Sequence, residues 1–373
     1  MPPKAIAVFT GDNHLRPSTW AKHPTLYGDA YESWRQIIGY ADRHMLPLLL
    51  LGDLFDSARP DSLSVGQYLH GVAALEQSRV PVHYIEGNHD QADPPWPSLS
   101  AWARPVGKFM LGDIPAYGLS FTTAGDLPHS LAAIPVETRL LLCHQSWQEI
   151  QRVGHCDGAF SMIPHGLVML TGDYHVCGTY TGTAANGETV IAHSPGSTAM
   201  QALNEPPAKY FGVLYDDLSV SWAQLATRPF ISVTVNSEQE LAELVERLRS
   251  EQMVTAGEKL PYDIQKPIVR VRYTDTIPEA YSRLLAVGEA YHLFLEPQRQ
   301  TTTHVVDVQA APQTAFHSLM SAVAELCPPA TQGYNAARRL LESTDPKTEL
   351  DALFSEFKIQ HATAGNSAGV PVG

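Results

Sequence analysis

Short apolar runs alternate with helical patterns up to about residue 225. Six of these runs are four or five residues long and rich in Leu, Ile and Val, which is typical of strands buried on both faces. They are Ala5–Phe9, Pro47–Leu51, Val82–Ile85, Leu140–Cys143, Leu167–Leu170 and Thr189–Ala192. Helices are expected between them, for instance over Asp29–His44 and Ser62–Gln77. This alternation predicts an α/β layered fold.

A second set of alternating segments follows Arg228 and predicts a small α+β unit. Its expected strands and helices are Phe230–Val235, Ser237–Arg249, Pro267–Tyr273, Ile277–Ala286, Tyr291–Leu295 and Thr303–Val308. The signal is helical from Pro312 to about Phe357, and the small, polar end Ala362–Gly373 is typical of disorder. We therefore predict a layered domain over 1–228, an α+β domain over 229–311, a helical segment over 312–360 and a disordered tail over 361–373.

Five short polar clusters each follow closely on one of the expected strands of the first domain. They are Gly11-Asp12-Asn13-His14, Gly52-Asp53-Leu54-Phe55-Asp56, Gly87-Asn88-His89-Asp90, Cys143-His144 and Gly172-Asp173-Tyr174-His175. In open α/β sheets, ligands bind beyond the carboxyl ends of the strands. We therefore expect the five clusters to converge on one site, although they are far apart in the sequence.

The residue types in these clusters are those of a metal site. Asp12 and His14 are two residues apart, so their side chains point the same way on an extended segment and can share one ion. Asp173 and His175 repeat this spacing. Mixed Asp, His and Asn ligands suit borderline metals such as Mn²⁺, Fe²⁺ or Zn²⁺. Two such ions roughly 3.5–4 Å apart can clamp an in-line displacement and activate a water as the nucleophile. Each cluster alone is more typical of an ordinary turn, so the prediction depends on their combination and order.

The composition limits the other classes of protein. No apolar run is long enough to span a membrane, and the N-terminus lacks the features of a signal peptide. The four cysteines form no CxxC pair and are expected to be free thiols in a reducing cytoplasm. The formal net charge of −14 counts against nucleic acid as a partner, although divalent cations in a cleft would offset it locally.

The order Asp-x-His, Gly-Asp-x-x-Asp, Gly-Asn-His-Asp, His, Gly-x-x-His resembles that of the calcineurin-like metallophosphoesterase superfamily. The resemblance implies a layered metallophosphoesterase β-sandwich flanked by helices. It also implies a first metal held by Asp12, His14, Asp53 and His175, and a second held by Asp53, Asn88, His144 and Asp173, with Asp53 bridging. His89 would then be catalytic, protonating the leaving group or stabilising the transition state. Asp56 would orient His89 as a carboxylate partner that raises its pKa.

One ligand departs from the family pattern. The last motif is usually Gly-His-x-His, whereas this chain has Asp at position 173. Asp173 can still bind a metal, but it adds a negative charge to the ligand set. Our hypothesis is that the lower charge favours the harder ions Mn²⁺ or Mg²⁺ over Zn²⁺. The alternative is that Asp173 is no ligand and that the second metal is weakly held.

Further residues near the motifs could contact a substrate. They are Arg16, Lys22 and His23 in the loop after the first cluster, together with His155, His165 and His193. Residues of these types more often belong to a solvated face or a satisfied core, so none of them is assigned a role.

Within the superfamily, the chain resembles the SbcD-type nuclease subunit of DNA repair. The second motif carries this likeness, together with Ser194-Pro195-Gly196-Ser197, the later Glu205 and Lys209-Tyr210-Phe211-Gly212-Val213. The α+β unit with Val269-Arg270-Val271-Arg272-Tyr273 is similar to the DNA-capping domain of those nucleases.

This resemblance implies a Mn²⁺-dependent DNA exonuclease and endonuclease. Its functions would be in DNA repair, recombination and replication, with DNA as the substrate and an SbcC-type coiled-coil ATPase as the partner. The helical segment 312–360 would dock on that partner or pack on the chain's own core, and a homodimer is possible. Two other classes remain open: a small-substrate phosphodiesterase or phosphatase with the same metals, and a non-catalytic scaffold.

Overall fold

A computed structural model of the chain describes most of its first 298 residues. The described residues are 2–298 without 17, 21–22, 58–70, 72, 74, 77, 92–97, 99–102, 152–155, 251–263 and 265, and beyond these 335–336 and 338–340. The chain divides into two compact units, Met1–Gln298 and Arg299–Gly373. No helix in the described part is long and apolar enough to cross a membrane.

Among its described residues, the first unit contains three larger sheets and a short two-stranded one. In chain order, its elements are β1 (Ala5–Thr10), β2 (Ser18–Trp20), β3 (His23–Tyr27), α1 (Asp29–His44), β4 (Leu48–Leu51), β5 (Val82–Ile85), β6 (Ala103–Pro105), β7 (Lys108–Leu111), β8 (Ile114–Leu119), α3 (Leu127–Ala132), β9 (Leu140–His144), η3 (Phe160–Met162), β10 (Val168–Gly172), β11 (Gly178–Thr183), β12 (Thr189–Ser194), β13 (Tyr210–Tyr215), β14 (Val220–Gln224), β15 (Phe230–Val235), α4 (Glu238–Ser250), β16 (Ile268–Thr274), α5 (Ala280–Leu285), η4 (Gly288–Ala290) and β17 (His292–Gln298).

Two six-stranded sheets pack face to face as a sandwich. Their strand orders are β14-β13-β1-β4-β5-β6 and β11-β12-β10-β9-β8-β7. The alternation of side chains along a strand explains why the central strands are apolar throughout. In β4, Leu49 and Leu51 face the core between the sheets, whereas Leu48 and Leu50 pack on the outer face. The predicted layered α/β architecture, with strands buried on both faces, is confirmed.

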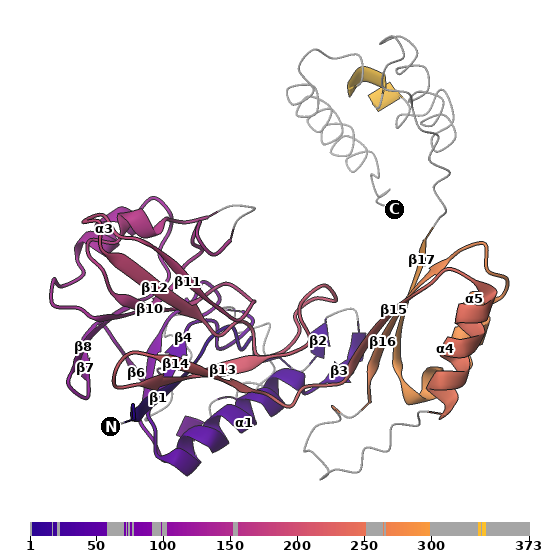
Figure 1. The fold of residues 1–373 in the computed structure, drawn as a ribbon, viewed down its shortest axis with the longest axis horizontal. Helices are drawn as coiled ribbons and strands as arrows, with labels where there is room; N and C mark the ends of the chain where they lie inside the picture. Colours follow the sequence, from indigo (N-terminus) through magenta and orange to yellow (C-terminus); the bar gives the residue numbers. More distant parts are fainter. Residues whose placement is uncertain are drawn as a thin grey trace, which may run out of the picture. The chain divides into compact units, whose positions relative to one another are not determined.

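Helix α1 covers the outer face of the first sheet (Figure 1). Trp34, Ile37, Ile38 and Ala41 recur at helical spacing and are all buried in the cluster that contains the outer side chains of β4. Each large apolar side chain buried in this way contributes about 1.5–3 kcal/mol. The helix ends at His44 and is capped by Met45, which adopts a left-handed conformation with φ 52°. The predicted bounds Asp29–His44 are those of the structure.

The third sheet has the order β15-β16-β17, and all of its strands are parallel. Helices α4 and α5 lie side by side against one of its faces, where their apolar residues share a core with the sheet (Figure 1). The unit is therefore a parallel β-α-β-α-β arrangement, a detail that the predicted α+β unit did not specify. The side chain of Arg228, just before β15, makes a two-pronged ion pair with Asp29 at the start of α1.

Several predictions lie wholly or largely outside the described residues. They concern the helix Ser62–Gln77, the strand Thr303–Val308, the helical segment 312–360 and the tail 361–373. The division of the chain into these four predicted parts stays a prediction. Strands β6, β7, β8, β11 and β14 were not expected, because they are short, half-exposed or interrupted by Pro and Gly. The loop predicted after the first cluster is also corrected, because it contains the short strands β2 and β3, which pair with each other. Cys143, Cys156 and Cys177 are free thiols, as predicted, and Cys327 is outside the described part.

Candidate metal centre

The carboxyl ends of β1 and β4 continue as two loops that stay side by side. After these parallel strands, Asp12 N–H donates to the Gly52 carbonyl (3.1 Å), and His14 N–H donates to the Asp53 carbonyl (3.0 Å). The parallel register therefore places the first two polar clusters next to each other. Strands β9 and β10 of the second sheet are also parallel and end at His144 and Gly172, directly before Asp173.

Four predicted ligands have positive backbone φ angles, which non-glycine residues rarely adopt. They are Asp12 (49°), His14 (43°), Asp53 (52°) and Asp173 (76°). Strain of this kind costs on the order of 1–3 kcal/mol per residue and clusters at functional sites. Its concentration on these residues supports a functional role for this end of the sandwich.

Two glycines are required for the close packing of these loops. Gly52 has a φ of 87°, and a Cβ there would lie 2.4 Å from Nδ1 of His144. A Cβ at Gly87 would lie 2.0 Å from Oδ1 of Asp53. Any larger residue at these positions would displace a predicted ligand, so the close approach of these loops requires glycine at both positions.

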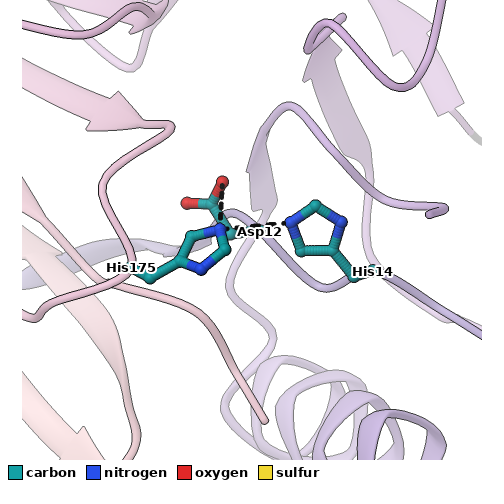
Figure 2. Close-up of side chains that lie close together, drawn as sticks. All are labelled: Asp12, His14 and His175. Atoms are coloured by element: carbon teal, nitrogen blue, oxygen red, sulfur yellow. Dashed lines mark hydrogen bonds and ion pairs between the residues drawn. The ribbon is translucent and has the colours of Figure 1, made fainter. Parts of the chain in front are cut away.

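Asp12, His14 and His175 form the first group of converging side chains. Figure 2 shows the three side chains facing one another. The Nε2 atoms of His14 and His175 are 3.3 Å apart, and Nε2 of His175 is 4.0 Å from Oδ1 of Asp12. The second oxygen of Asp12, Oδ2, is buried without a hydrogen-bond partner. A buried carboxylate oxygen without a donor is costly, and a cation would relieve that cost.

His144 belongs to a second group that also contains Asp12 and Asp53. Nδ1 of His144 lies 2.7 Å from the Leu51 carbonyl oxygen and donates to it, which directs Nε2 into the site. Nε2 lies 3.1 Å from Oδ1 of Asn88 and 3.5 Å from Oδ2 of Asp53. It is also 3.8 Å from Oδ1 of Asp173, which places the unusual aspartate in this group.

The charges around His144 favour a cation in the second group. Burial lowers the pKa of His144, but the contact with Asp53 and the charges of Asp12 and Asp173 together outweigh burial and raise the pKa to about 10. Burial conversely raises the pKa of Asp53, but His144 and His14 outweigh it and lower this pKa to about 2. A proton or a metal ion bound to Nε2 of His144 would be stabilised by the same carboxylate charges.

Asp53 lies between the two groups. Its Oδ2 is 3.8 Å from Nε2 of His14 and 3.5 Å from Nε2 of His144. Its Oδ1 accepts a hydrogen bond from the His89 N–H at 2.9 Å. This placement suits a bridging carboxylate. Carboxylate oxygens and imidazole nitrogens converge here, and both are ligands of divalent metal ions. The residues present are therefore compatible with the expected pair of metals.

The structure corrects the expected pairing of His89 with the Asp56 carboxylate. Nδ1 of His89 lies 2.8 Å from the main-chain carbonyl of Asp56 instead. The carboxylate of Asp56 turns to Nδ1 of His14 (3.4 Å) and to the guanidinium of Arg16 (2.7 Å). The Asp56 carboxylate forms an ion pair with the Arg16 guanidinium. His89 is therefore oriented by a neutral acceptor, the main-chain carbonyl of Asp56. His89 still forms a third group with His14 and Asp53.

Two supporting residues had no role in the sequence-based prediction. Asp90 is fully buried and accepts main-chain N–H bonds from both the second and the third cluster. Glu205 accepts a hydrogen bond from Nδ1 of His175 at 2.9 Å. Asp90 stood in the Gly-Asn-His-Asp motif and Glu205 in the Pro-Gly-Ser region, but only the tertiary contacts show which atoms they hold.

The other candidate residues do not join these groups. His165 bonds to the Thr138 carbonyl (3.0 Å), and His193 bonds to Oγ1 of Thr179 (2.9 Å). Burial lowers the pKa of His193 to about 4, so it is a neutral core residue. Arg16 lies beside the site, where its guanidinium forms an ion pair with the Asp56 carboxylate. The side chains of Lys22, His23 and His155 are outside the described part.

Comparison with known proteins agrees with this geometry. Residues 7–156 match the model of the calcineurin-like phosphoesterase family. Over 232 residues the chain is 25% identical to the DNA double-strand break repair protein Mre11 of Methanosarcina mazei. The match covers 57% of this chain and 37% of that protein, so the chain spans little more than a third of the length of this relative. The expected superfamily is confirmed.

Proposed function

We propose that the chain is a two-metal phosphodiesterase that cleaves DNA as an exonuclease and endonuclease. The observation that carries the proposal is the convergence of carboxylate, amide and imidazole groups at the ends of β1, β4, β5, β9 and β10, within a calcineurin-like phosphoesterase domain. Four of these side chains are buried, those of Asp12, His14, Asp53 and His144. The similarity to a DNA double-strand break repair protein supports DNA as the substrate.

Seven residues would hold the metals. His14 and His175 with Asp12 would serve one position, His144 with Asn88 and Asp173 the other, and Asp53 both. When bound, two divalent ions would supply charge neutralisation for a transferring phosphoryl group and a nucleophile at neutral pH. The extra negative charge of Asp173 supports Mn²⁺, with Mg²⁺ as the second choice.

His89 would be the catalytic residue. Its donated Nδ1–H fixes the ring against the Asp56 carbonyl, so Nε2 is free to exchange a proton with the substrate. Its main-chain N–H anchors Asp53, which couples the position of the ring to the bridging carboxylate. In the protonated ring, Nε2 can donate to the leaving oxygen or to a developing charge on phosphate.

The wider assembly is also part of the proposal. The SbcD-type resemblance suggests an SbcC-type coiled-coil ATPase as the partner, docking on residues 312–360. The third sheet with α4 and α5 would serve as the DNA-capping domain. Its presence next to the phosphoesterase domain supports a polymeric substrate over a small one.

The test is hydrolysis of linear single- and double-stranded DNA with Mn²⁺, beside bis-p-nitrophenyl phosphate. The full chain is compared with His89→Ala and with a matched control, His165→Ala, whose ring lies before the first residue of β10 and thus at the opposite end of that strand from Asp173. We expect DNA cleavage that requires Mn²⁺, falls by about 10²–10⁴ in kcat in His89→Ala and is retained in the control. Turnover of the small diester with both DNA forms left intact, even with a partner ATPase added, would instead establish a small-substrate phosphodiesterase.

A further inference from the structure

The segment between β12 and β13 turns back towards the first group of ligands. Glu205, within this segment, bonds to His175 through one carboxylate oxygen, Oε1, at 2.9 Å. Its other oxygen, Oε2, accepts from Nζ of Lys209 (2.7 Å), Oγ of Ser197 (3.0 Å) and the N–H of Gln201 (3.0 Å). The carboxylate is therefore held by three donors on one side and offers its remaining oxygen to a predicted metal ligand.

This network is withdrawn from solvent. The side chain of Lys209 is 3% exposed and that of Glu205 is 12% exposed. Nζ of Lys209 also donates to Oγ of Ser197 at 2.8 Å, and the N–H of Ser197 bonds to the His175 carbonyl at 3.2 Å. Lys209 directly precedes β13, which pairs with β14 and β1 and is therefore an inner strand of the first sheet. A buried carboxylate and ammonium are tolerated only as a pair, so each keeps the other in place.

The contact with Glu205 decides which nitrogen of His175 carries the proton. A neutral imidazole has one N–H, and a carboxylate beside Nδ1 holds that proton there. The lone pair of Nε2 then points towards Nε2 of His14 and Oδ1 of Asp12. A carboxylate behind a histidine ligand also makes the ring a stronger donor to a metal.

The two metal positions differ in this respect. His144 donates its Nδ1–H to the neutral Leu51 carbonyl, whereas His175 donates to a carboxylate. Lys209 compensates the charge of Glu205, so the ring gains a strong acceptor without a further net negative charge beside Asp12. The environment of the two rings is therefore asymmetric, although both rings present Nε2 to the site.

We infer that Glu205, held by Lys209, is a positioning residue that fixes the tautomer and orientation of His175 and thereby sets the affinity of one of the two metal positions. This inference rests on the proposed function, because it assigns His175 to a metal. Glu205 touches neither substrate nor reacting atoms, and it acts only through the ring.

The test uses the full chain as wild type, Glu205→Gln and Glu205→Ala. Glu205→Gln keeps the volume and one acceptor oxygen. The control is Glu188→Gln, an exposed carboxylate before the first residue of β12, at the other end of that strand from Ser194. Nitrogen-15 NMR of the metal-free protein reports the tautomer of His175, and titration with Mn²⁺ followed by electron paramagnetic resonance reports the two affinities.

We expect an Nδ1–H ring at His175 in the wild type and a mixture of tautomers in Glu205→Ala. The affinity for Mn²⁺ should fall about 10–100-fold at one position and stay unchanged at the other. Glu205→Gln should retain the tautomer with a smaller loss of affinity, and the control should match the wild type. Because Glu205→Gln is isosteric, it decides the question if Glu205→Ala does not fold.

Wild-type affinities at both positions in folded Glu205→Gln and Glu205→Ala would overturn the inference, as would an unchanged tautomer in Glu205→Ala. Equal losses at both positions would also overturn it, because they indicate a general structural role. A wild type that binds no Mn²⁺ would refute the proposed function, and this result is distinct from a variant that binds as the wild type does.

Discussion

Asp90 offers a quantitative test of how the second and third clusters are joined. Its side chain is fully buried, and its two oxygens accept N–H bonds from Leu54 (3.1 and 3.3 Å), Phe55 (3.4 Å) and Gly87 (3.1 Å). Burial and the charge of Asp53 raise the pKa of Asp90 to about 6, against the lowering effect of the Gly87 and Phe55 N–H groups. The carboxylate therefore serves as a cross-link but is costly when ionised.

The sign of the pH effect follows from this raised pKa. The native protein binds the Asp90 proton more tightly than the unfolded chain, whose pKa is 3.8. Its favourable contribution is therefore complete below pH 3.8 and is lost as the pH rises through 6. A pKa difference of about 2 corresponds to about 3 kcal/mol of native stability lost by pH 7.

Two substitutions separate the charge from the hydrogen bonds. Asp90→Asn removes the charge and keeps one acceptor oxygen, whereas Asp90→Ala leaves all three N–H groups without an acceptor. Each buried group left unsatisfied costs about 1–3 kcal/mol. Neither variant carries the buried negative charge, so their difference in stability reports the hydrogen bonds alone. If the oxygen kept in Asp90→Asn accepts two of the three N–H groups, Asp90→Ala should be less stable than Asp90→Asn by about 2–6 kcal/mol.

The assay is urea unfolding of the metal-free protein, with a chelator present, between pH 4 and 7. The free energy of unfolding of Asp90→Asn minus that of the wild type should rise by about 2 kcal/mol over this range, because part of the total change occurs below pH 4. A difference that is flat or falls with pH would refute the assigned cost of the charge. Equal stability of the Asn and Ala variants would refute the role of Asp90 as a hydrogen-bonded cross-link.

Three further predictions concern the metals and the joint before β15. Because the surrounding carboxylates raise the pKa of His144, a metal ion must displace the proton on this ring. The apparent affinity for Mn²⁺ should therefore rise about tenfold per pH unit between pH 6.5 and 8.5. An affinity that calorimetric titration finds independent of pH would contradict this prediction. Asp173→His should move the metal preference from Mn²⁺ towards Zn²⁺ and make the reaction less dependent on high pH, so an unchanged metal ranking and pH–rate profile would remove the charge argument. Asp29→Ala should lower the free energy of unfolding by about 3–5 kcal/mol, because it leaves the buried Arg228 guanidinium without its carboxylate partner. In urea unfolding, the double variant with Arg228→Met should lose less stability than the sum of the losses in the two single variants. Strictly additive losses would disprove the coupling between the two residues.

Local patterns explain the parts of the fold that the sequence could predict. Trp34, Ile37, Ile38 and Ala41 follow the helical period, and the prediction of Asp29–His44 needs no distant contact. Strand β15 was likewise expected over its observed bounds Phe230–Val235. The half-exposed β11 was not predicted, because its sequence GTYTGT shows no clear alternation of apolar and polar residues. Its main-chain hydrogen bonds to the neighbouring strand β12 hold it in the sheet.

The sequence by itself determined the residue types of the site and their positions after strands. An aspartate, a histidine or an asparagine after an apolar run is a local property, and the parallel arrangement of such runs brings their ends together. That reasoning was sufficient to name the residues that the structure brings together at one end of the sandwich.

Only the tertiary structure decided which atom meets which partner. His14 and His175 are 161 residues apart, and their 3.3 Å contact exists because the two sheets pack face to face with their strand ends aligned. The same packing brings Arg16 to the Asp56 carboxylate, so that His89 bonds to a carbonyl instead, and it places Glu205 behind His175. Hydrogen bonds depend on tenths of an ångström and on orientation, which the sheet register and loop packing set and which no local pattern encodes.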